Sequence, residues 1–214
     1  HGVVDLLHEA PDFIPHAGAH LLAAFAGGFP PGTVFLAVVD PGVGTPRDAV
    51  VVLADGRWFV GPANGLLSVI AARASDVRIW RIVWRPDALS ATFHGRDLFA
   101  VIAAEIARGE FPTGKLAARD RLTVEFDAGD LPRVIYVDHY GNAWTGVRGV
   151  PPDTRVHAAG ALFRHSESFG FVGRGEGFWF VNSVGLVELA VNRGSAAAHF
   201  GLKLGDPVEV QRLN

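Results

Sequence analysis

The hydrophobic pattern of this chain changes near residue 118, and that change limits the folds it can adopt. Before this point, short apolar runs rich in β-branched residues alternate with segments whose apolar residues recur at helical spacing. The predicted strands of this half are 34–39, 50–53, 58–60 and 77–83, and its predicted helices are 16–26, 65–73 and 96–108. Beyond it, strands separated by Gly, Pro and Asn turns follow one another, at 133–137, 155–158, 178–181, 187–191 and 208–210.

Strands that alternate with helices and then strands alone indicate two domains. The first pattern predicts an α/β domain with a helix-flanked, mostly parallel sheet, over residues 1–125. The second predicts a smaller all-β, barrel-like domain over residues 126–214. The boundary falls within 118–132, a polar stretch that ends in Gly-Asp-Leu-Pro.

Composition excludes several classes of protein. Lys and Arg number 19 against 22 Asp and Glu, so the net charge of −3 provides no basic surface for nucleic acid or an anionic membrane. No apolar run reaches the roughly 18 residues of a membrane span, and no signal-peptide pattern is present, so we expect a cytoplasmic protein. The absence of Cys excludes disulfides, thiolate metal sites and cysteine nucleophiles.

Two familiar motifs are incomplete. Residues 109–116 resemble a phosphate-binding loop, but Leu116 stands where Ser or Thr would hold magnesium, and the segment follows a predicted helix. His16 and His20 share one helix face without the intervening Glu of a zinc protease and without an evident third ligand. We therefore expect no bound metal, and helix histidines at these two positions.

Polar segments follow the predicted strands of the first domain. Residues 38–47 bring Asp40 to the carboxyl end of a strand, where α/β proteins bind ligands, and then carry Arg47 on a Pro/Gly-rich loop. A tight turn whose Asp bonds loop amides explains the same residues equally well. Residues 59–68 form a turn before a helix that Asn64 would cap, and residues 92–97 carry His94 beside Gly95.

The second domain has its own polar-aromatic segments, at 138–145, 182–185 and 192–197. They combine amide and hydroxyl side chains with Tyr and Trp, a set that suits a flat heteroaromatic ligand with polar edges. Ordinary turns are the alternative for each of them taken singly.

Taken together and in order, these segments resemble the S-adenosyl-L-methionine hydroxide adenosyltransferases, a family once known only as a domain of unknown function. The resemblance covers residues 3–210 and rests on VVDPGVGTPR, FVGPANGLLS, TFHGRD, DHYGNAWT and NSVGLVELAVNRGSAA. Halide-using fluorinases and chlorinases are relatives of this family. It implies an N-terminal α/β domain, a C-terminal β-barrel-like domain and a homotrimer with ligands bound between subunits.

The resemblance also implies catalytic residues. In the hydroxide-using branch an Asp–Arg–His set activates water, and its positions match Asp40, Arg47 and His94. The halide enzymes typically carry tyrosines at the Asp and His positions, which places this chain on the water-using side. Gly95 is Ser in fluorinases and Gly in chlorinases, so it does not discriminate by itself. Whether Asp40 or His94 is the base stays open.

Substrate contacts carry over by position. Asn142 is expected to bond the adenine edge, with Tyr140 and Phe171 against its faces. Asp138, Trp144 and Ser183 are expected to hold the methionine amino and carboxylate groups. The other expected substrate-binding residues are Phe13 over the ribose, Thr92 near the reacting carbon, Phe93, Gly95 and Arg193.

The chain departs from the family pattern in two ways. Val184 stands where fluorinases have an Arg for the substrate carboxylate. The family's opening strand, whose Asp holds the ribose hydroxyls, has no counterpart in these 214 residues. The sequence also lacks Met altogether, so we expect an N-terminal segment to be missing from it.

The resemblance implies hydrolysis of S-adenosylmethionine to adenosine and L-methionine, by attack of activated water on the ribose 5′ carbon. The molecule is then the substrate, and neither cofactor nor metal is expected. Two alternatives remain: a halide adenosyltransferase, and a non-catalytic protein that binds S-adenosylmethionine or adenosine. Asp40 and His94 argue against a halide adenosyltransferase. Absence of the opening strand from the natural protein would favour a non-catalytic binder.

Overall fold

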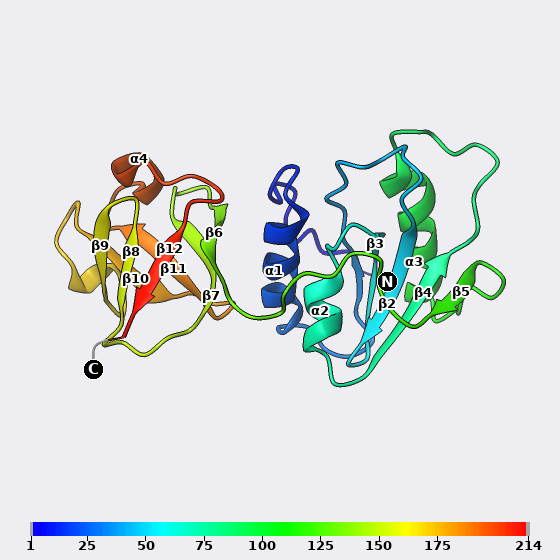
Figure 1. The fold of residues 1–214 in the computed structure, drawn as a ribbon, viewed down its shortest axis with the longest axis horizontal. Helices are drawn as coiled ribbons and strands as arrows, with labels where there is room; N and C mark the ends of the chain where they lie inside the picture. Colours follow the sequence, from blue (N-terminus) through cyan, green and yellow to red (C-terminus); the bar gives the residue numbers. More distant parts are fainter. Residues whose placement is uncertain (1, 213–214) are drawn as a thin grey trace. The chain divides into compact units, whose positions relative to one another are not determined.

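The computed structural model describes residues 2–212 and separates the chain into two compact units (Figure 1). The first unit ends at Ala128 and the second begins at Gly129, within the polar stretch expected to connect two domains. The predicted boundary after residue 125 lies three residues earlier. Each unit has its own hydrophobic core and is described by itself.

The first unit contains a five-stranded sheet in the order β1-β3-β2-β4-β5. Its strands are β1 (Val34–Leu36), β2 (Ala49–Ala54), β3 (Arg57–Pro62), β4 (Val77–Ile82) and β5 (Leu116–Arg119). Its helices are α1 (Pro15–Ala26), α2 (Ser68–Arg73), a π-helical turn η1 (Gly95–Phe99) and α3 (Ala100–Ala107), which continues directly from η1.

The pairing within this sheet corrects the expectation that it is mostly parallel. Only β1 and β3 run parallel, whereas β2 pairs antiparallel with both β3 and β4, and β4 pairs antiparallel with β5. Asp55 and Gly56 are the two residues between β2 and β3, and both have positive φ, at 45° and 77°. A two-residue Asp-Gly turn of this kind joins only neighbouring antiparallel strands, so this dipeptide was the overlooked signal.

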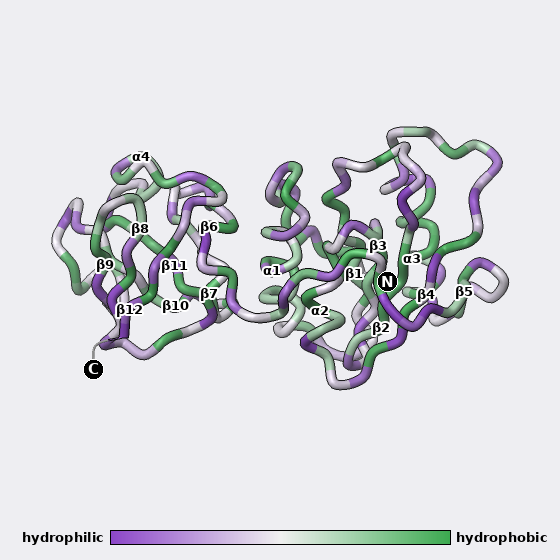
Figure 2. Tube along the Cα trace, in the orientation of Figure 1, coloured by the Kyte–Doolittle hydropathy of each residue, from purple (hydrophilic) through white to green (hydrophobic). Residues whose placement is uncertain are grey.

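Helices cover both faces of the sheet, as predicted. On one face Val51 and Val60 pack with Leu98 of η1 and Ile102 of α3. On the other face Val50, Val52 and Phe59 pack with Ala26 of α1 and Ile70 of α2. Figure 2 shows the apolar stretches of α3 and of the strands in green. Because β2 is buried on both faces, it reads as an unbroken apolar run.

The second unit is a seven-stranded barrel-like sheet in the order β12-β8-β9-β10-β11-β7-β6. Its strands are β6 (Leu131–Val137), β7 (Ala143–Arg148), β8 (Arg155–Ala158), β9 (Ala161–His165), β10 (Gly177–Val181), β11 (Leu186–Val191) and β12 (Val208–Gln211). A 3₁₀ turn η2 (Phe169–Phe171) and a short helix α4 (Ala196–Phe200) interrupt the strands.

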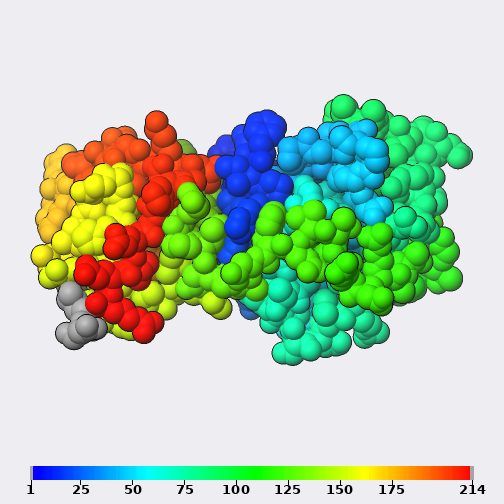
Figure 3. Space-filling model, viewed as in Figure 1, coloured from blue at the N-terminus to red at the C-terminus, as the bar shows by residue number. Residues whose placement is uncertain are grey.

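The two edge strands of this sheet meet, which nearly closes it. Arg133 on β6 forms a bridge with Pro207 just before β12, and Val134 donates its amide to the carbonyl of Asp206 at 2.9 Å. Figure 3 shows β12 in red beside the yellow residues of β8, its partner in the sheet. Closure removes exposed strand edges, and the interior is filled by buried side chains that include Trp179 and Phe163.

Strand β7 begins within residues 138–145, which the sequence pattern suggested as a polar-aromatic loop. Thr145 is buried within it, and its hydroxyl donates to the carbonyl of Val187 at 2.8 Å. This bond satisfies the hydroxyl group, so a polar residue can face the interior of the barrel. The strand therefore lacks the alternation of polar and apolar residues by which it could have been predicted. Strands β5 and β9 were likewise not predicted.

None of the helices described within residues 2–212 has the length and apolarity needed to cross a membrane.

Candidate active site

The chain leaves β1 and passes close to β3 before it reaches Asp40. Ala37 continues the pairing by donating its amide to the carbonyl of Val60 at 3.0 Å. A Cβ atom at Gly61 would lie 2.3 Å from the carbonyl oxygen of Ala37, so only glycine allows this approach. Asn64 then donates its side-chain amide to the carbonyl of Val39 at 2.8 Å. Asn64 therefore holds the residue before Asp40, in addition to accepting from the amide of Leu66.

Asp40 and Arg47 form a two-pronged ion pair across the loop between them. Nε of Arg47 donates to Oδ1 of Asp40 at 2.7 Å, and Nη2 donates to Oδ2. Nη1 donates to the carbonyl of Asp48 at 3.0 Å, and the guanidinium lies over the Phe99 ring. The Asp40 and Arg47 side chains are only 5% and 11% exposed, so solvent screens this pair weakly.

His94 joins the pair from the segment that precedes η1. Its Nδ1 lies 3.2 Å from Nη2 of Arg47, and its side chain is buried. Because a guanidinium can only donate, Nδ1 of His94 is the acceptor and the neutral ring carries its proton on Nε2. Burial lowers the pKa of His94 below 6.5, the Arg47 charge lowers it further, and the Asp40 charge partly opposes both.

Two glycines bring the Asp40 loop and the His94 segment together. Gly44 has a φ of 79°, and a Cβ atom there would lie 2.9 Å from the carbonyl oxygen of Ala91. Gly95 packs on Val38, with its Cβ position 3.7 Å from the side-chain methyl groups. The structure thus assembles the three residues predicted to be catalytic from segments 47 residues apart.

The other residues predicted for the substrate in this unit are exposed. Thr92 and Phe93 flank His94, and Phe93 lies under the guanidinium of Arg96 at 4.7 Å. Phe13 precedes α1 with a positive φ of 58° and a ring that is 78% exposed. A bulky residue in the left-handed region is strained, and such strain is concentrated at functional sites.

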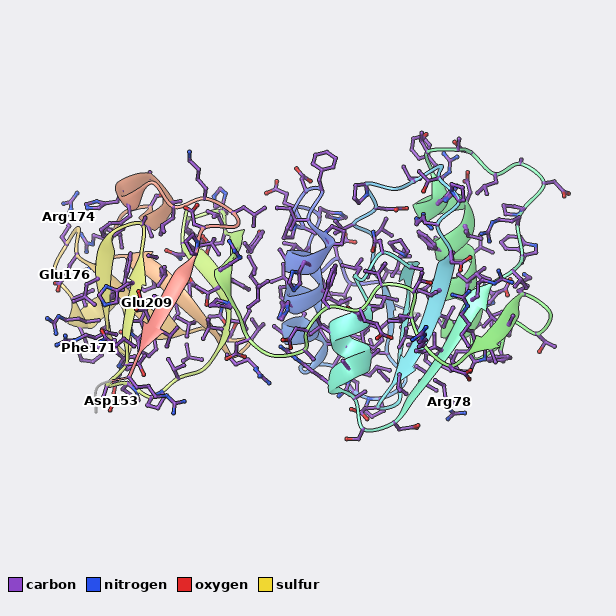
Figure 4. The ribbon with its side chains drawn as sticks, viewed as in Figure 1. Arg78, Asp153, Phe171, Arg174, Glu176 and Glu209 are labelled. Atoms are coloured by element: carbon purple, nitrogen blue, oxygen red, sulfur yellow. The ribbon has the colours of Figure 1, made fainter. Side chains whose placement is uncertain are left out.

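The second unit has an open pocket of about 610 Å³. Its lining residues are Asp138, Tyr140, Asn142, Phe169, Val191, Arg193 and Gly194. Four of them were predicted to bind substrate, namely Asp138, Tyr140, Asn142 and Arg193. Trp144, Phe171 and Ser183 do not line it. Phe171, labelled in Figure 4, is 75% exposed at the end of η2, whereas Phe169 at the start of that turn reaches the pocket.

Asp138 shapes the turn that presents the pocket residues. Its Oδ1 accepts the amides of Tyr140 at 2.9 Å and Asn142 at 2.8 Å, and its Oδ2 accepts the Asn142 side chain at 3.2 Å. Gly141 packs so closely that a Cβ atom there would lie 2.0 Å from Oγ of Ser195. Ala197 donates its amide to the carbonyl of Gly141, which fastens this turn to α4. The turn leaves the Tyr140 ring exposed and the Asn142 side chain buried.

Glu188 is a polar residue of this region that sequence analysis did not single out. It lies within β11 and is 4% exposed, and its carboxylate accepts the Asn182 side chain at 3.1 Å. Burial raises the pKa of Glu188 to about 7, and the charge of Asp138 contributes to that rise. A lone acidic residue inside the apolar run Leu186–Val191 was the available signal.

No group of three or more His, Cys, Asp or Glu side chains suited to a metal ion occurs within residues 2–212. His16 stacks on Phe126 with ring centroids 4.3 Å apart, and His20 is buried next to Arg73. Both histidines thus have protein neighbours on the helix face where a metal pair was considered.

Two family models match this chain. The model of the SAM hydroxide adenosyltransferase N-terminal domain matches residues 1–116, and that of the C-terminal domain matches residues 132–209. The two matches correspond to the two units of the fold.

Individual proteins match over nearly the whole chain. An (R)-S-adenosyl-L-methionine hydrolase of Thermus thermophilus is 38% identical over 97% of this chain and 87% of its own length. A Salinispora tropica protein of the same name is 39% identical over 97% and 85%. A fluorinase of Nocardia brasiliensis is 25% identical over 98% and 86%. The crystal structure of an uncharacterized conserved protein from Thermotoga maritima superposes with a TM-score of 0.87, at 32% identity, over 99% and 89%.

Proposed function

Because this chain belongs to the SAM hydroxide adenosyltransferase family, we propose that it hydrolyses S-adenosyl-L-methionine to adenosine and L-methionine. The observation that carries this proposal is the assembled Asp40–Arg47–His94 cluster, which offers an anion, a cation and a neutral imidazole at one place. Relatives named (R)-S-adenosyl-L-methionine hydrolase are 35–39% identical over 97% of the chain, whereas the fluorinases are 25–28% identical.

The proposed reaction displaces a sulfonium group. A water oxygen forms a bond to the 5′ carbon of the ribose while the carbon–sulfur bond breaks, and its electron pair stays on sulfur. Methionine therefore leaves as a neutral thioether that needs no proton. Of the two protons of the attacking water, one stays on the new hydroxyl group of adenosine and the other passes to the protein and then to solvent. A leaving group that is already activated needs no metal or cofactor, so the protein's task is to position and activate water.

Asp40 is the group we propose to orient this water and to take its proton. Each carboxylate oxygen gives one lone pair to Arg47 and keeps another for water. Arg47 supplies positive charge where hydroxide character develops, a form of electrostatic stabilisation that is strong in a buried site. Neutral His94 adds no positive charge that would repel the sulfonium substrate, and its Nε2–H is a donor.

The pocket of the second unit is the proposed site for the adenine and amino acid parts of the substrate. Asn142 has an amide suited to the adenine edge, and Tyr140 offers a ring for its face, while Asp138 suits the ammonium group. Phe13, Thr92, Phe93, Gly95, Trp144, Phe171, Ser183 and Arg193 complete the proposed contacts. The family resemblance implies a homotrimer, which light scattering in solution tests. The cytoplasmic location stays a prediction.

The relatives' names specify the R form of the substrate, and this extends the proposal to stereochemistry. In that name "L" fixes the α-carbon, so the R descriptor refers to the sulfonium sulfur. We propose that the same epimer is the substrate here. The R and S epimers, supplied separately, then differ in their rate of hydrolysis.

The test is to incubate the protein with each epimer and separate the products by chromatography, with and without chloride. Adenosine and methionine in equal amounts support hydrolysis. A 5′-chloroadenosine product identifies a halide adenosyltransferase, and binding without turnover identifies a non-catalytic binder; both contradict the proposal. The Asp40→Asn variant removes the charge and is expected to lose turnover, whereas Asp153→Asn, at an exposed position of the other unit, is its matched control.

A further inference from the structure

Glu188 is the most deeply buried acidic side chain near the pocket, and the reaction as proposed assigns it no role. Within the sheet it lies opposite Trp144 of β7 and opposite Phe180 of β10. A carboxyl group in such surroundings is costly unless hydrogen bonds satisfy it. The residues that hydrogen-bond to Glu188 therefore indicate which part of the structure its carboxyl group holds in place.

Both partners are amide side chains from turns that carry predicted substrate contacts. Asn182 donates from Nδ2 to Oε2 of Glu188 at 3.1 Å, while its Oδ1 accepts the amides of Val184 and Leu186 at 3.2 and 3.0 Å. These bonds define the turn that contains Ser183. Glu188 fixes which way the Asn182 amide faces, because only its NH₂ group can donate to a carboxylate.

The second amide belongs to Asn142. Its side chain lies close enough to Glu188 to favour the ionised carboxylate, which lowers the pKa of Glu188, and it donates to Oδ2 of Asp138 at 3.2 Å. One buried carboxyl group thus connects the turn of Asp138 and Asn142 with the turn of Ser183. Removal of its oxygens would leave the Asn142 side chain bonded to Asp138 alone and the NH₂ group of Asn182 without its carboxylate acceptor.

We infer that Glu188 is a positioning residue of the substrate site, whose carboxyl group holds the Asn142 and Asn182 side chains, and with them the turns of Asp138 and Ser183, in the orientation that binds the substrate. This inference rests on the proposed function and adds a residue to it. The ionised carboxylate suits this arrangement best, because protonation turns one of the two acceptor oxygens into an O–H donor that faces an amide NH₂ group.

The charge state of Glu188 makes the arrangement dependent on pH. From β7 and β10 the opposing side chains are the uncharged Trp144 and Phe180, and the charge that acts on Glu188 is that of Asp138. The pKa of Glu188 is about 7, so the protein without substrate holds both protonation states at neutral pH. An ammonium group bound at Asp138 favours the ionised state, and substrate binding therefore releases a proton.

The experiment compares wild type with Glu188→Gln, measuring KM and kcat for S-adenosylmethionine between about pH 6 and pH 8. If only the ionised state binds well, KM of the wild type falls about tenfold over this range, as linkage to one group of pKa about 7 requires. The variant is expected to keep the high KM of the wild type at pH 6 throughout, with kcat within about threefold. Glu209→Gln, at an exposed position of β12 that is labelled in Figure 4, is the matched control.

Titration of the substrate's own amino group affects both proteins alike, so the difference between them isolates Glu188. A variant that retains the tenfold change in KM, or that loses kcat with an unchanged KM, overturns the inference. If no protein form releases adenosine, the proposed function fails instead, and a binding measurement still tests Glu188.

That measurement uses wild type alone and does not depend on the folding of a variant. S-adenosylhomocysteine, which has the ammonium group but no sulfonium, is titrated calorimetrically at pH 7 in two buffers of different ionisation enthalpy. Proton release on binding is expected, and it is distinct in sign from proton uptake by the ligand's amine or by His94. Binding without proton release overturns the inference.

Discussion

Nη2 of Arg47 lies 3.2 Å from Nδ1 of His94, so the imidazole receives a hydrogen bond from a permanent cation. A second proton on this ring would place two positive groups in contact and break that bond. The same guanidinium holds Asp40 through Nε and Nη2, so one side chain both binds the carboxylate and favours the neutral imidazole.

The first prediction concerns the acid side of the pH profile. The pKa of His94 is below 6.5 in the folded protein, so the active neutral form persists below pH 6.5 and kcat falls only at more acidic pH. Stability is expected to fall with acidification as well. Below pH 6.5 the unfolded chain binds more protons at His94 than the folded protein does, so lowering the pH below 6.5 lowers the free energy of unfolding. Initial rates and urea unfolding from about pH 4.5 to 8 measure both.

His94→Gln is expected to remove this part of the stability change, because Gln does not titrate. His8→Gln, whose side chain is 82% exposed, is the control and leaves the profile unchanged. A kcat that declines with a midpoint above pH 6.5 would contradict the neutral imidazole.

The second prediction separates the shape of Arg47 from its charge. Lys in its place keeps the charge but cannot donate to both oxygens of Asp40 and to His94 from one planar group. We expect Arg47→Lys to lower kcat by at least about 100-fold, the usual loss when one electrostatic donor is removed, with KM within a few-fold. Arg78→Lys, at an exposed position of β4 that is labelled in Figure 4, should retain full activity. Equal kcat values for Arg47→Lys and wild type would show that catalysis does not require the two-pronged ion pair of Arg47 with Asp40.

The third prediction tests the packing beneath the pocket turn. Gly141→Ala combines an unfavourable φ of 82° with a Cβ atom 2.0 Å from Oγ of Ser195, so we expect a loss of about 2 kcal/mol or more in the free energy of unfolding. Gly160→Ala has a similar φ of 75° with no atom within 4 Å and reports the backbone cost alone. Urea unfolding of both variants provides the comparison; equal losses would show that contact with Ser195 is unimportant.

The fourth prediction distinguishes two phenylalanines of one 3₁₀ turn. Phe169 lines the pocket, whereas the resemblance assigns Phe171 to the adenine face. From the pocket geometry we expect Phe169→Ala to raise KM about tenfold or more, as loss of a ring that stacks on a base does, and Phe171→Ala to raise it less. Phe169 also packs edge-to-face on Phe178, so thermal unfolding accompanies the kinetics. A larger effect at Phe171 would favour the assignment made from the resemblance.

The fifth prediction concerns stability at alkaline pH. The pKa of Glu188 rises from 4.5 to about 7 on folding, so its contribution is complete below pH 4.5 and is lost as pH rises through 7. Glu188→Gln avoids the cost of a buried charge. It is expected to be more stable than wild type at pH 8, by at most about 3.5 kcal/mol, since one pKa unit corresponds to about 1.4 kcal/mol. Guanidinium unfolding at pH 5 and pH 8 measures this, and a variant less stable at pH 8 would contradict it.

Sequence patterns predicted the elements whose periodicity is plain, and the family resemblance predicted that Asp40, Arg47 and His94 act together. The helix predicted at 16–26 begins at Pro15, and that at 65–73 begins at Ser68, because the turn of Asn64 comes first. The strand direction in the first sheet was wrong, since the Asp55-Gly56 turn was not recognised as a hairpin.

The features that could not be predicted from the sequence are mostly buried polar side chains within strands. Thr145 and Glu188 interrupt apolar patterns, and only the bonds they make across the sheet explain why a strand tolerates them. The choice of Phe169 over Phe171 for the pocket likewise depends on how a three-residue turn is oriented, which hydrophobic periodicity does not encode.

Arg193 has a positive φ of 58° at the rim of the pocket and is followed by a glycine. Glycine adopts that backbone conformation at no steric cost, whereas arginine is strained there by about 1 kcal/mol or more. Arg193→Gly would relax the backbone and delete a pocket guanidinium in the same step. Selection for thermal stability alone therefore drives this position towards glycine, and screens for robust variants of this protein must assay catalysis alongside stability.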